Sequence, residues 1–317
     1  MGSVRNTMNE LKAMKEGFRW GRRPLVPRSA EEHTEPKLDR VFPSDWARTD
    51  AGVAARQVIL KAGMSPIVRN ELTLRVYGRD NLSGVEAPLI FFSNHSSHLD
   101  ATLIMCTLPD AWQAKTAVGA ARDYFFDVWW RQAFTALVYG AFPIDRTRGA
   151  KGAVDKAREL LAEGWSIVVF PEGTRSPDGH LQRFRHGAAR LALETGAGLA
   201  PIAIVGAYQA MPKGRFWPRS GRPPVTIRYG EPFRPGETDS HQDLSRRMTQ
   251  AVTQLFDEDR ATWWEALHRA NRGETPSLVG PPGPEWLRRW EGSRPVGRTG
   301  PAKVWDCLLY TSDAADE

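Results

Sequence analysis

The chain has 317 residues, 41% of them hydrophobic and 25% charged, a composition typical of a globular protein with a sizeable core rather than of a disordered or fibrous chain. Its two cysteines exclude a disulfide framework, which favours a cytosol-facing location. The net charge of +6 and the twelve tryptophans indicate an anionic partner: nucleic acid, anionic lipid or a phosphorylated substrate.

We expect no segment that crosses a membrane. The longest uncharged stretches are residues 132–144 and 195–212, and the second contains two prolines and three glycines. A membrane-spanning helix needs about 20 mostly apolar residues, which neither stretch supplies. The Lys- and Arg-rich beginning of the chain also lacks the apolar core of a secretory signal.

The two ends of the chain differ from its middle. Residues 1–45 are charged and have no hydrophobic period, which predicts an extended arm. Residues 46–64 place apolar side chains near helical spacing up to Gly63, which predicts an amphipathic helix that either packs on the core or lies on a membrane surface. Residues 273–317 are rich in Pro, Gly and Arg and predict a poorly packed tail. Its last eleven residues, 307–317, resemble a translated sequencing adapter, and we leave them out of functional reasoning.

Strand and helix patterns alternate in the predicted domain, residues 46–272. Short β-rich or apolar runs predict strands, and longer amphipathic runs predict helices. The predicted strands are 72–78, 88–94, 166–170, 200–207 and 224–230, and the predicted helices are 98–108, 122–136, 150–162, 187–195 and 244–269. This alternation indicates an α/β fold: a single domain with a mixed, largely parallel central sheet flanked by helices, plus the N-terminal amphipathic helical segment.

The stretch SNHSSHLDATL (93–103) follows a predicted strand, at the edge where sheets of this kind bind ligands. Three interpretations stay open from these residues alone. The Ser and Asn side chains are good helix caps. His95, His98 and Asp100 are ligand types for zinc, although their spacing departs from the zinc motif His-x-His-x-Asp-His. Finally, Asp100 lies one turn into the predicted helix and can reach back to His95, which would make a general-base pair.

Two further turns carry groups that suit an anion. The first, SIVVFPEGTRSPDG (166–179), runs from a predicted strand into Glu172, Gly173, Thr174 and Arg175. Here the glycine can bring backbone N–H groups close to an anion, the threonine can donate, and the arginine can bind a phosphate through two N–H groups. The second, GAFPIDRTRG (140–149), ends an apolar run and contains Arg146. Three such turns, each after a strand-like run, favour the acid/base pair beside an anion site.

The segments NHSSHLD, GAFPIDR, FPEGTRS with FRHG, and LAPIAI resemble, in this order, the four motif blocks of the glycerophospholipid acyltransferases. This is the family of 1-acylglycerol-3-phosphate acyltransferase. The resemblance spans roughly residues 72–260, and the paired His-x4-Asp and Glu-Gly-Thr-Arg-Ser blocks are highly specific. One position departs from the pattern: Pro143 stands before Ile-Asp-Arg, where the family usually has Phe, which puts the identity of the acceptor in doubt more than the reaction class.

The resemblance implies a role for each motif residue. His95 is the general base, and Asp100 orients it. The glycerol phosphate of the acceptor is held by Arg146, Glu172, Gly173, Thr174 and Arg175. Pro201, in the fourth block, lines the acyl or acceptor pocket, and His98 is a helper or bystander. No metal or prosthetic group is implied, and the acyl donor is acyl-CoA or acyl carrier protein.

The expected partners are this donor, a lysophospholipid acceptor and a membrane phospholipid surface, with the protein peripheral on the cytoplasmic face of the cell membrane. Lys213–Arg234 has six positive charges to one negative, with Phe216 and Trp217 between them, which favours docking on anionic lipid. The acceptor could instead be another lysophospholipid or glycerol 3-phosphate. From other classes, a non-catalytic lipid- or nucleic-acid-binding protein explains the charge but not the three turns, and a metal-dependent hydrolase is disfavoured by the ligand spacing. We therefore expect no nucleic acid.

Overall fold

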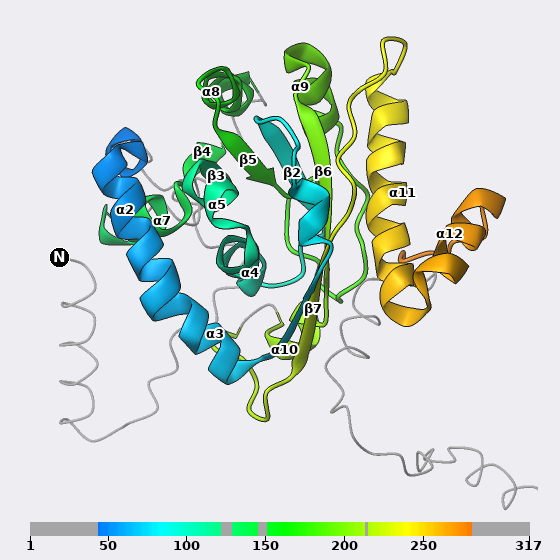
Figure 1. Ribbon diagram of the computed structural model, residues 1–317, viewed down its shortest axis with the longest axis horizontal. Helices are drawn as coiled ribbons and strands as arrows, with labels where there is room; N and C mark the ends of the chain where they lie inside the picture. Colours follow the sequence, from blue (N-terminus) through cyan, green and yellow to red (C-terminus); the bar gives the residue numbers. More distant parts are fainter. Residues whose placement is uncertain (1–43, 122–128, 145–150, 213–214, 281–317) are drawn as a thin grey trace, which may run out of the picture. The chain divides into compact units, whose positions relative to one another are not determined.

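The computed structural model describes residues 44–121, 129–144, 151–212 and 215–280 (Figure 1). These residues belong to one compact unit, Phe42–Glu317. The strands are β1 (Thr73–Tyr77), β2 (Leu89–Ser93), β3 (Thr116–Ala121), β4 (Phe142–Ile144), β5 (Ser166–Val169), β6 (Gly198–Val205) and β7 (Pro224–Tyr229). Most of the predicted arm, most of the predicted tail, and Arg146 lie outside the described residues.

The strands form one sheet in the order β1-β7-β6-β2-β5-β3-β4. Neighbouring strands are parallel except for β6 and β7, which pair antiparallel. The mixed, largely parallel sheet expected from the sequence is therefore confirmed. Two of its strands, β3 and β4, are not among the predicted ones. For β3 the reason is that the Ala- and Gly-rich run TAVGAA has little intrinsic preference for a strand.

Helices cover both faces of the sheet. They are α2 (Asp50–Val58), α3 (Ser65–Glu71), α4 (Leu99–Thr107), α5 (Asp110–Ala114), α7 (Trp129–Tyr139), α8 (Lys151–Ala162), α9 (Gly187–Thr195), α10 (Ala207–Ala210), α11 (His241–Arg260) and α12 (Trp263–Arg272). Short 3-10 turns occupy Asp45–Arg48 and Arg79–Leu82. In the part of the chain that the structure describes, no helix is long and apolar enough to cross a membrane.

The central strand β2 shows why the core has two halves. Side chains alternate between the faces of a strand, so Ile90 and Phe92 join the cluster under α8, α9 and α11, whereas Leu89 and Phe91 join the cluster under α3 and α4. Every residue of β2 is buried. A strand covered on both faces is apolar throughout, which is the pattern that predicts it from the sequence.

The predicted helix 122–136 is described only from Trp129, where α7 begins, because residues 122–128 lie outside the described residues. Two other predicted helices differ from the observed ones. The expected helix over 46–64 begins at Asp50 and does not stop at Gly63, because a π-helical turn, Ile59–Met64, carries the chain into α3. The expected helix over 244–269 is two helices. Ala261 is extended, and Thr262 starts α12 with a capping box in which Thr262 and Glu265 each accept the other's backbone N–H.

One arginine is fully buried where α2 meets the rest of the domain. The Arg56 guanidinium donates to the carbonyl oxygens of Ala47 at 2.6 Å and Leu137 at 2.9 Å. Burial lowers the pKa of Arg56 to about 10, with a smaller contribution from the charge of Arg48. Gly140 leaves room for it, since a Cβ there would lie 2.9 Å from the guanidinium. The arginine therefore joins α2 to the turn Asp45–Arg48 and to α7 by donating to the carbonyl groups of Ala47 and Leu137.

Replacing Arg56 by Met should lower the free energy of unfolding by about 2–4 kcal/mol, because two buried carbonyl groups lose their donors while the alkyl volume is kept. Chemical denaturation of the wild type and variant measures the difference. The control is Arg190→Met on the exposed side of α9, which should change stability by no more than about 0.5 kcal/mol. Equal losses from both variants would contradict a joining role for Arg56.

Candidate functional site

The turn after β2, residues 94–98, lies at the carboxyl ends of the parallel strands; we call it the His95 turn. Its first residue fixes it to the sheet. The Asn94 side-chain amide accepts from the N–H of Ile204 and donates to the carbonyl oxygen of Ile204, both at 2.9 Å. Because Ile204 lies in β6, the turn is held against a neighbouring strand, and the residues that follow project from a rigid base.

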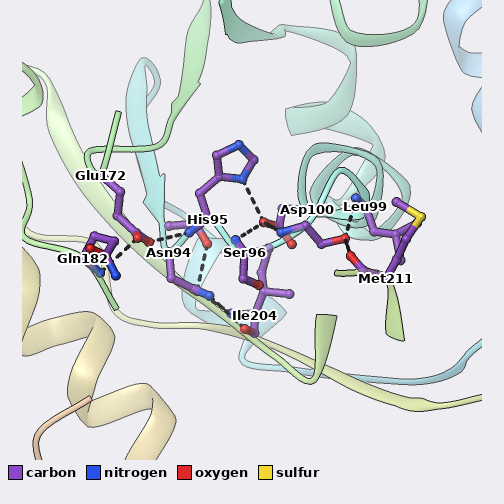
Figure 2. A network of polar contacts seen from close by, with 11 residues as sticks. Asn94, His95, Ser96, Leu99, Asp100, Glu172, Gln182, Ile204 and Met211 are labelled. Carbon is purple, nitrogen blue, oxygen red and sulfur yellow. Dashed lines mark hydrogen bonds and ion pairs between the residues drawn. The ribbon is translucent and has the colours of Figure 1, made fainter. Parts of the chain in front are cut away.

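Asp100 holds His95 and the turn together. Its side chain is fully buried, and one carboxylate oxygen, Oδ2, accepts from His95 Nδ1 at 2.8 Å (Figure 2). The same oxygen accepts from the backbone N–H groups of Ser96 at 2.7 Å and Ser97 at 2.8 Å. Asp100 also lies in the first turn of α4, where the helix dipole favours a negative charge. Asp100 therefore holds the imidazole and the backbone of the turn through a single carboxylate oxygen.

This contact fixes which ring nitrogen of His95 carries the proton. A carboxylate accepts, so Nδ1 donates and Nε2 is left as an acceptor. The ring stacks on Phe170 with centroids 4.1 Å apart, and 18% of the side chain is exposed. His95 can therefore accept a proton through Nε2 from a group that reaches it from solvent or from a bound molecule.

The turn after β5, residues 170–176, packs against the His95 turn; we call it the Glu172 turn. Ser176 donates its backbone N–H to the carbonyl oxygen of His95 at 2.7 Å. The buried Glu172 carboxyl accepts the backbone N–H of His95 at 2.6 Å through one oxygen and that of Gln182 at 3.0 Å through the other. The two motif blocks, about 75 residues apart in sequence, are thus joined by hydrogen bonds on both sides of His95.

Burial has the largest effect on the Glu172 carboxyl and raises its pKa to about 8, although the two N–H donors pull in the opposite direction. The role that the family resemblance implies for this residue, holding the glycerol phosphate, stays a prediction. What the structure shows is a carboxyl group with both oxygens turned to backbone N–H groups (Figure 2). Glu172 therefore fixes the position of the His95 backbone.

The other predicted residues of the Glu172 turn are only partly buried or exposed. Gly173 has a φ of +75°, and a Cβ there would meet Arg185 Nε at 2.8 Å, so the turn requires glycine. Arg175 is partly buried, and its charge is close enough to His98 to contribute to the lowered pKa of that ring. The contact of these residues with a phosphate stays a prediction.

His98 lies in the His95 turn, between His95 and Asp100 in the sequence. Burial is the main cause that lowers the pKa of His98 to about 4, and the charges of Arg175 and His95 act in the same direction. The ring is therefore neutral at ordinary pH. Among the described residues, no group of three or more His, Cys, Asp or Glu side chains is arranged to hold a metal ion, and the absence of a metal stays a prediction.

Pro201 lies in β6, where it pairs with Phe92 of β2. These two strands are neighbours in the middle of the sheet, and the His95 turn follows β2 directly. Its predicted contact with the acyl or acceptor chain stays a prediction, and Arg146 lies outside the described residues.

A cavity of about 140 Å³ lies between the two turns and α11. Its lining includes His95 and Glu172 on one side and Phe256 and Arg260 of α11 on the other. Leu278, which follows α12, also lines it, and its carbonyl oxygen accepts a hydrogen bond from the N–H of Leu181 at 3.2 Å. The beginning of the predicted tail therefore packs on the core.

The sequence did not predict several supporting residues. Asn94 and Ser97 are helix-cap types, but Asn94 bonds β6, and Ser97 donates its hydroxyl to the carbonyl oxygen of Met211 at 2.7 Å. Neither contact has a signal in the local sequence, because the partner is a backbone group more than a hundred residues away. The sequence predicts Phe170, which stacks on His95, only as the last residue of a buried strand.

Part of the chain is similar in sequence to known proteins. Residues 73–205 match the model of the Acyltransferase family. The chain is 32% identical over 144 residues to the chloroplastic 1-acyl-sn-glycerol-3-phosphate acyltransferase LPAT1 of Arabidopsis thaliana, covering 44% of this chain and 38% of that protein. It is 28% identical over 131 residues to a 1-acyl-sn-glycerol-3-phosphate acyltransferase of Borreliella burgdorferi, covering 41% of this chain and 50% of that one. The chain thus spans half or less of the length of these curated relatives.

A solved structure shares the fold. The 1-acyl-sn-glycerophosphate acyltransferase PlsC of Thermotoga maritima is 25% identical, with a TM-score of 0.54, and the match covers 71% of this chain and 86% of that one. Both the His95 turn and the Glu172 turn lie within the residues that match the family model. Over residues 73–205 the chain is therefore similar to the Acyltransferase family model, and it resembles 1-acyl-sn-glycerol-3-phosphate acyltransferases in sequence and in fold.

Proposed function

We propose that this protein transfers a fatty acyl group from acyl-CoA or acyl carrier protein to the free hydroxyl of 1-acylglycerol-3-phosphate, giving phosphatidic acid. The observation that carries the proposal is the 2.8 Å contact between His95 Nδ1 and the buried carboxylate of Asp100 at the carboxyl edge of the sheet. The names of the relatives support the acceptor, and the pair supports the chemistry.

The reaction needs one proton acceptor and no covalent acyl-enzyme. His95 Nε2 takes the proton from the acceptor hydroxyl as the hydroxyl oxygen attacks the thioester carbonyl carbon. When the tetrahedral intermediate collapses, the C–S bond breaks, and the imidazolium returns the proton to the leaving sulfur. Asp100 stays ionised and stabilises the imidazolium between the two steps. A positioned general base supplies about 10²–10⁴-fold, which suits a thioester that is already activated.

The Glu172 turn contributes position. Thr174 and Arg175 face the anionic group of the acceptor in this proposal, together with Arg146, and Gly173 allows the backbone to approach it. Glu172 acts through His95, because its carboxyl holds the backbone N–H of that residue. No metal or prosthetic group takes part in any step of the proposal.

The experiment that tests the proposal is release of CoA from acyl-CoA by the purified full chain. The acceptor panel contains 1-acylglycerol-3-phosphate, glycerol 3-phosphate and other lysophospholipids, each with and without chelator. We expect the highest kcat/KM with 1-acylglycerol-3-phosphate and no effect of chelator. If no acceptor supports CoA release, the proposal fails and a non-catalytic binding protein is favoured. Loss of activity with chelator would favour a metal-dependent enzyme instead.

Replacing His95 by Ala should lower kcat by about 10²–10⁴-fold, because the acceptor hydroxyl loses its proton acceptor. The matched control is His268→Ala, an exposed histidine of α12, which should keep kcat within about twofold of the wild type. Thermal melting shows whether both variants are folded. A His95→Ala enzyme as active as the control would exclude His95 as the base.

Replacing Asp100 by Asn should lower kcat by about 10²–10⁴-fold with little change in KM, because the neutral amide no longer stabilises the imidazolium. Steady-state kinetics with the preferred acceptor separate the two constants. The side chain keeps its size and can still accept from the amides of Ser96 and Ser97. A rise in KM at unchanged kcat would assign Asp100 to acceptor binding rather than to His95.

Glu172→Gln should change how stability depends on pH. Burial raises the pKa of Glu172 from 4.5 to about 8, so the folded protein keeps a proton that the unfolded chain releases in this range. The stabilisation from this group is complete below pH 4.5 and is lost as the pH rises to about 8. Between these values the wild type should therefore lose more unfolding free energy than the glutamine variant. Denaturation curves that fall in parallel would contradict this assignment.

A further inference from the structure

Four exposed aromatic side chains lie in two segments that follow, in sequence, residues in contact with the His95 turn or lining the cavity. Phe216 is 85% exposed and Trp217 is 56% exposed, in the segment between α10 and β7. Trp263 and Trp264, at the start of α12, are 60% and 61% exposed. Paired exposed aromatics are costly in water and usually mark a contact surface. The reaction proposed above uses none of them.

The first pair is connected to the His95 turn. Met211, whose carbonyl oxygen accepts the hydroxyl of Ser97, lies just before the segment 215–223. This segment is held in place, because the Trp217 indole donates to the Glu71 carboxylate at 3.1 Å and Arg222 donates to the carbonyl oxygen of Arg69 at 2.9 Å. Phe216 and Trp217 are therefore displayed by an ordered segment beside the site.

The second pair follows a residue that lines the cavity. Arg260, the last residue of α11, lines the cavity that also contains His95, and α12 begins three residues later. Arg269 fixes α12 with two hydrogen bonds to the Asp257 carboxylate, at 2.7 and 2.8 Å. In Figure 1, α10 and the start of α12 lie at the lower end of the domain, the end toward which β2 and β6 run.

The positive charges of residues 215–223 favour an anionic membrane as the partner of this surface. Residues 215–223 contain three arginines, Arg215, Arg219 and Arg222, and no acidic residue. Tryptophan favours the headgroup level of a bilayer, and basic residues are attracted to its anionic lipids. A second copy of this chain is disfavoured, since docking through the same surface would bring the arginines of both copies together.

We propose that Phe216, Trp217, Trp263 and Trp264 form a docking surface for anionic phospholipid, which we call the aromatic rim. Docking holds the His95 turn at the headgroup level, where an amphiphilic acceptor presents its hydroxyl. The role of the rim in presenting the acceptor to His95 rests on the proposed function, but binding of the protein to lipid requires no turnover.

The test is co-sedimentation of the purified full chain with vesicles of phosphatidylcholine alone or mixed with phosphatidylglycerol. We expect binding to the mixed vesicles that weakens in high salt. Phe216→Ser with Trp217→Ser, and separately Trp263→Ser with Trp264→Ser, should each lower the partition coefficient by at least about tenfold, because each pair loses its apolar contact. Arg219→Glu should lower it by about fivefold or more on the mixed vesicles only.

The controls carry the same chemical changes away from the rim. Phe134→Ser on α7 removes an aromatic side chain that is 51% exposed, and Arg190→Glu on α9 reverses a charge. Both should bind vesicles like the wild type. The inference is overturned if the rim variants also bind like the wild type. It is equally overturned if they lose only self-association in size-exclusion chromatography, or only binding to a single-stranded oligonucleotide.

Failure of this inference differs from failure of the proposed function. Turnover is measured separately with a short-chain acceptor below its critical micelle concentration, where no lipid surface is present. Rim variants should keep wild-type turnover in this assay, and a loss of turnover there would assign the aromatics to the site rather than to docking. Vesicle binding without any turnover by the wild type would reject the enzyme and keep the rim.

Discussion

The hydrogen bond between His95 and Asp100 is the interaction on which the site depends. A buried carboxylate is costly unless it is paired and hydrogen-bonded. One oxygen of Asp100 accepts from the imidazole and from two backbone N–H groups, whereas the buried Oδ1 has no hydrogen-bond partner among the described residues. The same three contacts shape the turn, so the group that orients the base also folds the loop that carries it. The five-residue separation between His95 and Asp100 places Asp100 in the first turn of α4, from which its side chain reaches back to His95.

The order of the strands places the His95 turn next to the turns that follow two other strands. β2 lies between β5 and β6 in the sheet, and all three run in the same direction, so their following turns meet at one edge. Glu172 then holds the backbone of His95, while Asn94 holds β6. The imidazole is thereby oriented by Asp100 and positioned by two neighbouring strands, which leaves Nε2 as the atom available for chemistry.

The sequence predicts the fold where local pattern and tertiary structure agree, as in the apolar run of β2 and the amphipathic period of α8. It predicts the His95–Asp100 contact because both partners are side chains of distinctive type, close in sequence. It cannot predict the role of Glu172, since the partners of that carboxyl are backbone groups, which carry no residue signature. The buried Arg56 is missed for the same reason: its acceptors are carbonyl oxygens of segments far apart in the chain.

The central claim is that Asp100 fixes the protonation of His95, and nitrogen NMR of the ¹⁵N-labelled protein tests it most directly. Long-range proton–nitrogen correlations distinguish the two tautomers of a neutral imidazole. The account predicts that neutral His95 carries its proton on Nδ1, with Nε2 unprotonated, and that Asp100→Ala, which removes the acceptor, loses this preference. A wild-type His95 protonated on Nε2, or one that averages between the two tautomers, would contradict it.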